Sequence, residues 1–251
     1  MTVNLTTTRA LAQSSGINIL VYGQAGVGKT TLIKTLPGKP IIISAEAGLL
    51  SLSDVDIPVI VVHTLQDVIN AYTFLQSPEG RQYDSVALDS ISEIAEVVLA
   101  NEKSNFKDAR KAYGEMQDKM AAMIRSFRDL DGRNVYMVAK QGHVNEGGNG
   151  LLKYYPMFPG QRLSQEAAFW FDEVLCLRVI NDAEGNVIRY LQTQPCFQYT
   201  AKDRSGKLDP EGEYPDLGHI INKIKGGGAP PPTHEPQKDD FLANGFEDLP
   251  Y

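Results

Sequence analysis

The chain has 251 residues, of which 42% are hydrophobic, and a formal net charge of −7. This size allows one substantial α/β domain with a buried core, and the acidic balance means that any nucleic-acid contact needs a local patch or a groove between subunits. Cys176 and Cys196 lack C-x-x-C spacing, no apolar run is long enough to span a bilayer, and residues 2–15 lack the apolar segment of a signal peptide. We therefore expect no disulfide framework, no zinc site and no membrane partner, and we expect a cytoplasmic location.

Residues 1–15 give no periodic signal and are predicted to form a loose lead-in. The first clear motif covers residues 17–31, INILVYGQAGVGKTT, in which an apolar strand precedes the pattern G-x-x-x-x-G-K-S/T. A helix is predicted to follow, from Lys29 to the stop signal Pro37-Gly38. An ordinary glycine-rich turn is the alternative, but every fixed position and both flanks match a phosphate-binding loop.

In such a loop, Gly23 and Gly28 allow backbone N–H groups to point inward at a phosphate chain, and the helix adds its positive end. Lys29 would reach the β- and γ-phosphates, and the Thr30 hydroxyl would hold Mg²⁺. The motif thus predicts a site for a nucleoside triphosphate and Mg²⁺, and it leaves open whether the nucleotide is ATP or another. Its predicted residues are Gly23, Gln24, Ala25, Gly26, Val27, Gly28, Lys29, Thr30 and Thr31.

Four further apolar stretches predict strands of a mostly parallel sheet, at residues 40–44, 57–63, 85–88 and 134–139. Three helices are predicted between them. The first begins at Thr64 with a capping box, the second follows Ser90, and the third covers residues 115–130. Their apolar faces carry Leu65, Val68, Ile69 and Tyr72 in the first, Ile91, Ile94, Ala95, Val98 and Leu99 in the second, and Met116, Met120, Met123, Ile124 and Phe127 in the third.

The later part of the chain differs in character. Residues 142–160 are rich in glycine and are predicted to be irregular, whereas residues 172–193 predict an antiparallel hairpin. The expected fold is an α/β P-loop NTPase core with helices on both faces of the sheet, this hairpin as an extension, and a disordered tail. The predicted parts are the lead-in 1–15, the ATPase domain 16–225, a Gly/Pro linker 226–238 and an acidic interaction tail 239–251.

A phosphate loop needs a second metal-side element, and Asp89 supplies it at the end of the strand SVALD. Asp89 could instead cap the following helix. The next residue is Ser90, whereas AAA+-type ATPases usually place a catalytic glutamate there, and this argues against that class. Glu46, just past the end of the second strand, lies at the carboxyl edge of the sheet and is the candidate base that activates water, with a solvated loop glutamate as the alternative.

The series GQAGVGKTT, IIISAEAGL, SVALDSISEI and VYMVAKQG resembles the RecA-like ATPase core in order and spacing, over residues 17–225. It looks most similar to phage-encoded RecA-like ATPases that are grouped with single-strand annealing and recombination proteins. This resemblance implies that Glu46 is the catalytic carboxylate, that Asp89 lies on the magnesium side, and that Gln141 senses the γ-phosphate. If the gene is phage-encoded, the cytoplasm is that of a bacterial host.

The resemblance also implies a homo-oligomer, ring or filament, in which basic residues reach the neighbouring subunit's ATP. Lys202 and Arg204 are the candidates for such a finger in trans, with a solvated charged loop as the alternative. Single-stranded DNA is the implied partner of the loop after Gln141. Its candidate contacts are aromatic and cationic side chains, namely His143, Lys153, Tyr154, Tyr155 and Arg162.

The chain ends in an acidic segment with a terminal Pro-aromatic pair, Asp248, Leu249, Pro250 and Tyr251. This end is similar in part to the C-terminal tip of bacterial single-stranded-DNA-binding proteins, which implies recruitment of host or phage replication and repair proteins. A disordered acidic tail is the alternative.

The resulting hypothesis is a Mg²⁺-dependent ATPase that acts on single-stranded DNA in phage-type recombination, annealing or repair, with turnover stimulated by DNA. One alternative is a kinase of nucleotides or small molecules, which the absence of an arginine-rich lid segment argues against. The other is a nucleotide-switched adaptor that recruits partners through its tail.

Overall fold

The computed structural model describes residues 5–46, 48–145, 150–181 and 185–227. The predicted interaction tail, with Asp248, Leu249, Pro250 and Tyr251, and all of the predicted linker except its first two residues lie outside this part of the chain.

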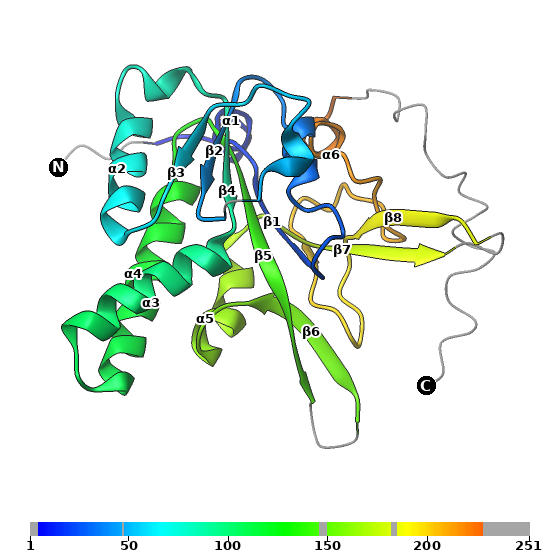
Figure 1. Cartoon of the computed structure of the whole chain (residues 1–251). Coiled ribbons are helices and arrows are strands. Elements are labelled where there is room, and N and C mark those ends of the chain that lie inside the picture. Colours follow the sequence, from blue (N-terminus) through cyan, green and yellow to red (C-terminus); the bar gives the residue numbers. More distant parts are fainter. Residues whose placement is uncertain (1–4, 47, 146–149, 182–184, 228–251) are drawn as a thin grey trace.

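One sheet organises the domain, in the order β3-β2-β4-β5-β1-β7-β8 (Figure 1). The strands from β3 to β7 in this order run parallel, and β8 is antiparallel to β7. Two strands lie off this path, since β6 pairs with β5 and β9 pairs with β7, both antiparallel. The bounds are β1 Asn18–Gly23, β2 Pro40–Ser44, β3 Val59–Val61, β4 Ser85–Asp89, β5 Asn134–Asn145, β6 Leu152–Met157, β7 Glu173–Asn181, β8 Val187–Gln192 and β9 Lys202–Asp203.

Helices cover both faces of the sheet, because the central strands bury side chains on both sides. On β1, Leu20 and Tyr22 belong to one core cluster, with α2, α3 and α4, whereas Ile19 and Val21 belong to the other, with η1 and α6. The α-helices are α1 Thr8–Ser14, α2 Leu65–Gln76, α3 Ile91–Asn105, α4 Ala109–Arg128, α5 Gln161–Glu166 and α6 Leu217–Ile224, and the 3₁₀ helices are η1 Thr31–Thr35, η2 Leu50–Leu52, η3 Gly80–Gln82 and η5 Ala167–Trp170.

The α/β class, the parallel strands and the late antiparallel hairpin were predicted and are confirmed. The capping box at Thr64 is also confirmed, because its side chain accepts from Asp67 N while the Asp67 carboxylate accepts from Thr64 N. On that helix, however, Ile69 was placed on the buried face and is 47% exposed.

The helix predicted from Lys29 to Pro37-Gly38 was wrong in type and length. The structure forms only a five-residue 3₁₀ helix, η1, at this point. Thr30, Thr31 and Ile33 are β-branched and disfavour an α-helix, and Pro37 limits the length that is available.

The prediction that residues 142–160 are irregular was also wrong for the part described here. β5 runs on to Asn145 and pairs with β6 from Lys140–Met157 to Asn145–Leu152, which forms a two-stranded arm beyond the edge of the sheet (Figure 1). Contacts from outside the arm also hold β6, because Tyr154 stacks on Tyr199 and its backbone bonds with Gln198 and Thr200. Such non-local contacts leave no signal in a glycine-rich stretch of sequence. Smaller differences are the helix α1 within the predicted lead-in, the shorter β3, and the earlier start of α4.

Candidate nucleotide site

The phosphate loop follows β1 at the carboxyl edge of the sheet, and its glycines are required by its geometry. A Cβ on Gly23 would lie 2.6 Å from the Leu177 carbonyl oxygen of β7, so no larger residue fits there. Gly26 and Gly28 have φ values of 77° and 109°, in the region that favours glycine, and no atom lies within 4 Å of a Cβ built on either. A Cβ at either position would thus point into open space, which leaves room beside the loop for a phosphate chain.

Lys29 lies inside this loop. Its ammonium group donates to the carbonyl oxygens of Gly23 at 2.9 Å and Gln24 at 2.7 Å. Burial lowers the pKa of Lys29, and the nearby carboxylates of Asp89 and Glu46 oppose that effect. The cation is thus held where an anion would be bound.

Tyr136 supports the loop from below, and the sequence analysis did not single it out. This fully buried residue of β5 donates from its hydroxyl to the Lys29 carbonyl oxygen at 2.8 Å. A tyrosine in an apolar strand gives no sequence signal for this contact, because the pairing spans 107 residues of chain.

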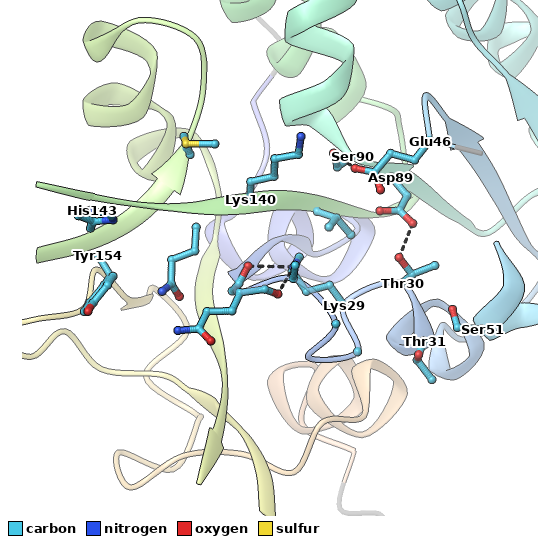
Figure 2. A pocket seen from close by; sticks show the side chains of 18 of the residues that line it. Lys29, Thr30, Thr31, Glu46, Ser51, Asp89, Ser90, Lys140, His143 and Tyr154 are labelled. Atoms are coloured by element: carbon cyan, nitrogen blue, oxygen red, sulfur yellow. Dashed lines mark hydrogen bonds between the residues drawn. The ribbon is translucent and has the colours of Figure 1, made fainter. Parts of the chain in front are cut away.

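Thr30 and Asp89 form the metal side of the site. The Thr30 hydroxyl donates to Asp89 Oδ2 at 2.7 Å (Figure 2). Burial raises the pKa of Asp89 to about 6, and the hydrogen bond from Thr30 opposes that effect. Within the described ranges no three His, Cys, Asp or Glu side chains converge. A hydroxyl and one carboxylate beside a phosphate cradle fit Mg²⁺, which binds proteins through few side chains and completes its coordination with water and substrate phosphates.

Glu46 reaches the same edge from β2. The Ser90 hydroxyl donates to Glu46 Oε1 at 2.7 Å, so the two residues join across neighbouring strands (Figure 2). Ser90 also caps α3, because its hydroxyl accepts from Glu93 N at 3.3 Å. The alternative role for Asp89 as the helix cap is therefore wrong, since Ser90 occupies that position.

These residues line one cavity of 730 Å³, and β5 and β6 form its other wall. Lys140 and Gln141 lie along this wall, with His143 and Tyr154 farther from Asp89 (Figure 2). The amide oxygen of Gln141 accepts from Cys176 Sγ at 3.9 Å. Lys140, which the sequence analysis did not single out although it precedes Gln141, forms an ion pair with Glu93.

The candidate DNA residues separate into three environments. Tyr154 stacks on Tyr199 with ring centroids 4.8 Å apart, and His143 packs at 6.2 Å from Tyr154. Lys153 and Tyr155 line a different cavity beside the arm. Arg162 lies on α5, where its guanidinium bonds with carboxylates on both sides, Asp118 at 3.1 Å and Glu166 at 3.1 Å.

Lys202 and Arg204 lie at the opposite edge of the sheet from the phosphate loop. β9 pairs with the beginning of β7, and the beginning of β7 pairs with the beginning of β1. Lys202 donates to the Phe171 carbonyl oxygen at 2.6 Å, and Arg204 forms an ion pair with Asp172 at 2.7 Å. Both cations are thus held within their own subunit and do not approach its nucleotide site.

Comparison with known families supports a nucleotide-binding site. A model described as an AAA domain matches residues 15–205, which is most of the chain, so the chain belongs to this family of P-loop NTPases. In the sequence analysis, Ser90 in place of a glutamate after Asp89 argued against AAA+-type ATPases. The chain nevertheless matches a model described as an AAA domain. No curated protein matched the sequence. The described helices include none that is both long and apolar enough to cross a membrane.

Proposed function

We propose that this AAA domain protein is a Mg²⁺-dependent, RecA-like ATPase that acts on single-stranded DNA in phage-type recombination, annealing or repair. The nucleotide chemistry follows from the family and from the site. The DNA substrate rests on one observation, namely that a single strand, β5, runs from the site into the projecting arm.

The middle and the C-terminal part of β5 have different neighbours. Its middle carries Lys140 and Gln141 beside the phosphate loop, and its last residues pair with β6 in the arm. Tyr154 of β6 lines the nucleotide cavity and also stacks on Tyr199. A change in the position of Gln141 on binding or loss of a γ-phosphate would therefore be passed to the arm, because both belong to one hydrogen-bonded ladder.

The arm carries chemistry that suits single-stranded nucleic acid. Tyr155 and Lys153 on β6 combine an aromatic face with a cation, and such pairs bind bases by stacking and phosphates by charge. The whole chain is acidic, so this local cationic site must act against the net field of the protein. Binding is therefore expected to weaken steeply with salt.

In hydrolysis, Lys29 and the loop N–H groups bind the phosphates, and Thr30 and Asp89 hold the metal side. Mg²⁺ supplies charge neutralisation on the phosphate oxygens when it is bound. Glu46, which accepts a hydrogen bond from Ser90, would take a proton from the attacking water, and Gln141, which lines the same cavity, would contact the γ-phosphate.

The proposal includes a homo-oligomer on DNA, as a ring or a filament. Lys202 or Arg204 would serve as a finger in trans only after release from Phe171 and Asp172, respectively. An oligomer in which both residues keep these contacts would need another cation at the subunit boundary.

ATP turnover by the purified chain, with and without single-stranded DNA at low and moderate salt, tests this function. We expect stimulation by DNA that declines as salt rises, since phosphate contacts release counterions. Turnover that is unaffected by DNA at every salt concentration would contradict the DNA role and would favour the kinase or adaptor alternatives.

A further inference from the structure

The phosphate loop borders a second cavity, on the side away from Glu46 and Asp89. It has a volume of 440 Å³ and shares Gly26, Gly28 and Thr31 with the larger cavity. The two cavities therefore adjoin the same part of the loop. A nucleotide whose phosphates lie inside the loop must place its ribose and base in adjoining space, and this volume is within the range of small-molecule sites.

The second cavity is lined by apolar groups and by cations. Val27, Leu177 and Pro215 supply apolar surface, and Lys34 and Arg189 supply the charged groups. Of the described residues that line it, none has a carboxylate or an amide side chain. Such a surface suits the flat face of a base, but it offers no carboxylate to accept from the N–H groups on a guanine edge.

Arg189 closes this cavity from β8 and is fixed to the phosphate loop. Its Nε donates to the Val27 carbonyl oxygen at 3.2 Å, although its side chain is otherwise exposed. One contact to the loop leaves the planar face of the guanidinium available to a ring. Arginine favours stacking on aromatic systems, because its charge is delocalised and weakly hydrated.

We propose that this second cavity binds the nucleoside half of the nucleotide, with Arg189 stacked on a purine base. Recognition is by stacking rather than by reading the base edge, so adenine and guanine nucleotides bind with similar affinity. The inference rests on the proposed nucleotide function and specifies which part of the chain holds the base.

Calorimetric titration with Mg²⁺-ADP and Mg²⁺-pyrophosphate tests the position of the base. We expect ADP to bind the unmodified chain about tenfold or more tightly than pyrophosphate. Arg189→Ala should weaken ADP binding about 3- to 30-fold and leave pyrophosphate binding unchanged. Arg189→Lys, which keeps a cation without the plane, should resemble Arg189→Ala, and Arg110→Ala on the surface of α4 should change neither ligand.

Three outcomes would overturn the proposal. Equal affinity for ADP and pyrophosphate would mean that the cavity holds no nucleoside, and an equal loss of both ligands in Arg189→Ala would mean that Arg189 acts only through the phosphate loop. A preference of more than about 100-fold between ADP and GDP would mean that the base edge is read.

Failure of the DNA role has a different signature. In that case turnover would ignore single-stranded DNA while ADP remained favoured over pyrophosphate and sensitive to Arg189. If neither ADP nor pyrophosphate bound, the nucleotide site itself would be wrong, and the inference would fall with it. Thermal denaturation of each variant confirms that the fold is intact, and Arg189 is exposed, so its replacement should leave the core unchanged.

Discussion

The Thr30 hydroxyl donates a 2.7 Å hydrogen bond to Asp89, which joins the phosphate loop to a strand that is not its neighbour in the sheet. β5 lies between β1 and β4, so this bond crosses one strand at the carboxyl edge. The Thr30 hydroxyl oxygen and the Asp89 carboxylate oxygen, which would both face Mg²⁺, are therefore adjacent in the protein itself.

Removing the Thr30 hydroxyl should abolish Mg²⁺-dependent turnover. We expect Thr30→Val to lower the rate about 100-fold or more, because one metal-side oxygen and one partner of the buried Asp89 are lost together. Thr30→Ser keeps the hydroxyl and should retain most of the activity. Steady-state phosphate release over a Mg²⁺ series measures both, and equal rates in the two variants would contradict a metal role for this hydroxyl.

Glu46→Gln should separate binding from hydrolysis. The amide keeps the size of the side chain and its acceptor for Ser90 but cannot take a proton from water, so turnover should fall about 100- to 10,000-fold while ATP still binds. Single-turnover kinetics and a binding titration measure the two effects. Glu96→Gln, at an exposed position on α3, is the matched control and should behave as the unmodified chain does. Normal turnover in Glu46→Gln would remove Glu46 from the chemistry.

Glu173 makes the stability of the domain depend on pH. Burial and the neighbouring Asp203 together raise its pKa to about 8, whereas an unfolded chain ionises this group near its ordinary value of 4.5. The folded state therefore holds a proton that the unfolded state releases between these values. Stability should consequently fall as pH rises from about 4.5 to 8, by at most about 1.4 kcal/mol per pH unit.

Glu173→Gln should remove this dependence, because the amide does not titrate. Urea unfolding at pH 5, 7 and 9 should show the variant gaining stability relative to the unmodified chain as pH increases. Glu211→Gln, which alters an exposed glutamate, should leave the profile unchanged. Parallel profiles for the Glu173 variant and the unmodified chain would contradict the raised pKa.

The arm residues should contribute unequally to DNA binding. Tyr155→Ala should weaken binding of an oligothymidine by about 1 to 3 kcal/mol, as expected for one lost stacking platform. Arg162→Ala should have a smaller effect than Tyr155→Ala, because Arg162 is already paired with two carboxylates, on α4 and α5. Fluorescence anisotropy at two salt concentrations compares them, and a dominant loss in Arg162→Ala would place the DNA path over α5 instead of the arm.

Two glycines should respond to alanine in opposite directions. Gly23→Ala places a methyl group 2.6 Å from a backbone oxygen of β7 and should lower the free energy of unfolding by about 1 to 3 kcal/mol. Gly114 lies inside α4 with nothing within 4 Å of a Cβ, so Gly114→Ala should raise it by about 0.5 to 1 kcal/mol. Chemical denaturation measures both. A stable Gly23→Ala variant would mean that β7 shifts easily away from the loop.

The elements that could be predicted are those whose signals are local in the sequence. The phosphate loop is contiguous in the chain, and the buried strands appear as short apolar runs, so the motif, the α/β class and the late hairpin were all predicted. The positions of Asp89 and Glu46 at strand ends were also predictable, because parallel strands end at a common edge of the sheet.

Which of these residues contact one another depends on how the chain folds. The bonds from Thr30 to Asp89 and from Ser90 to Glu46 connect residues far apart in the chain, and Arg189 reaches Val27 across 162 positions. The arm was predicted as a loop because its strands stabilise each other only once they pair, and strand pairing is a non-local property. The sequence shows that Lys202 and Arg204 are cations but not which edge of the sheet they lie on. The antiparallel pairing of β9 with β7 places them at the opposite edge from the nucleotide site. The sequence specifies the chemical type of each side chain. Its neighbours in space depend on the order in which the strands pair in the sheet.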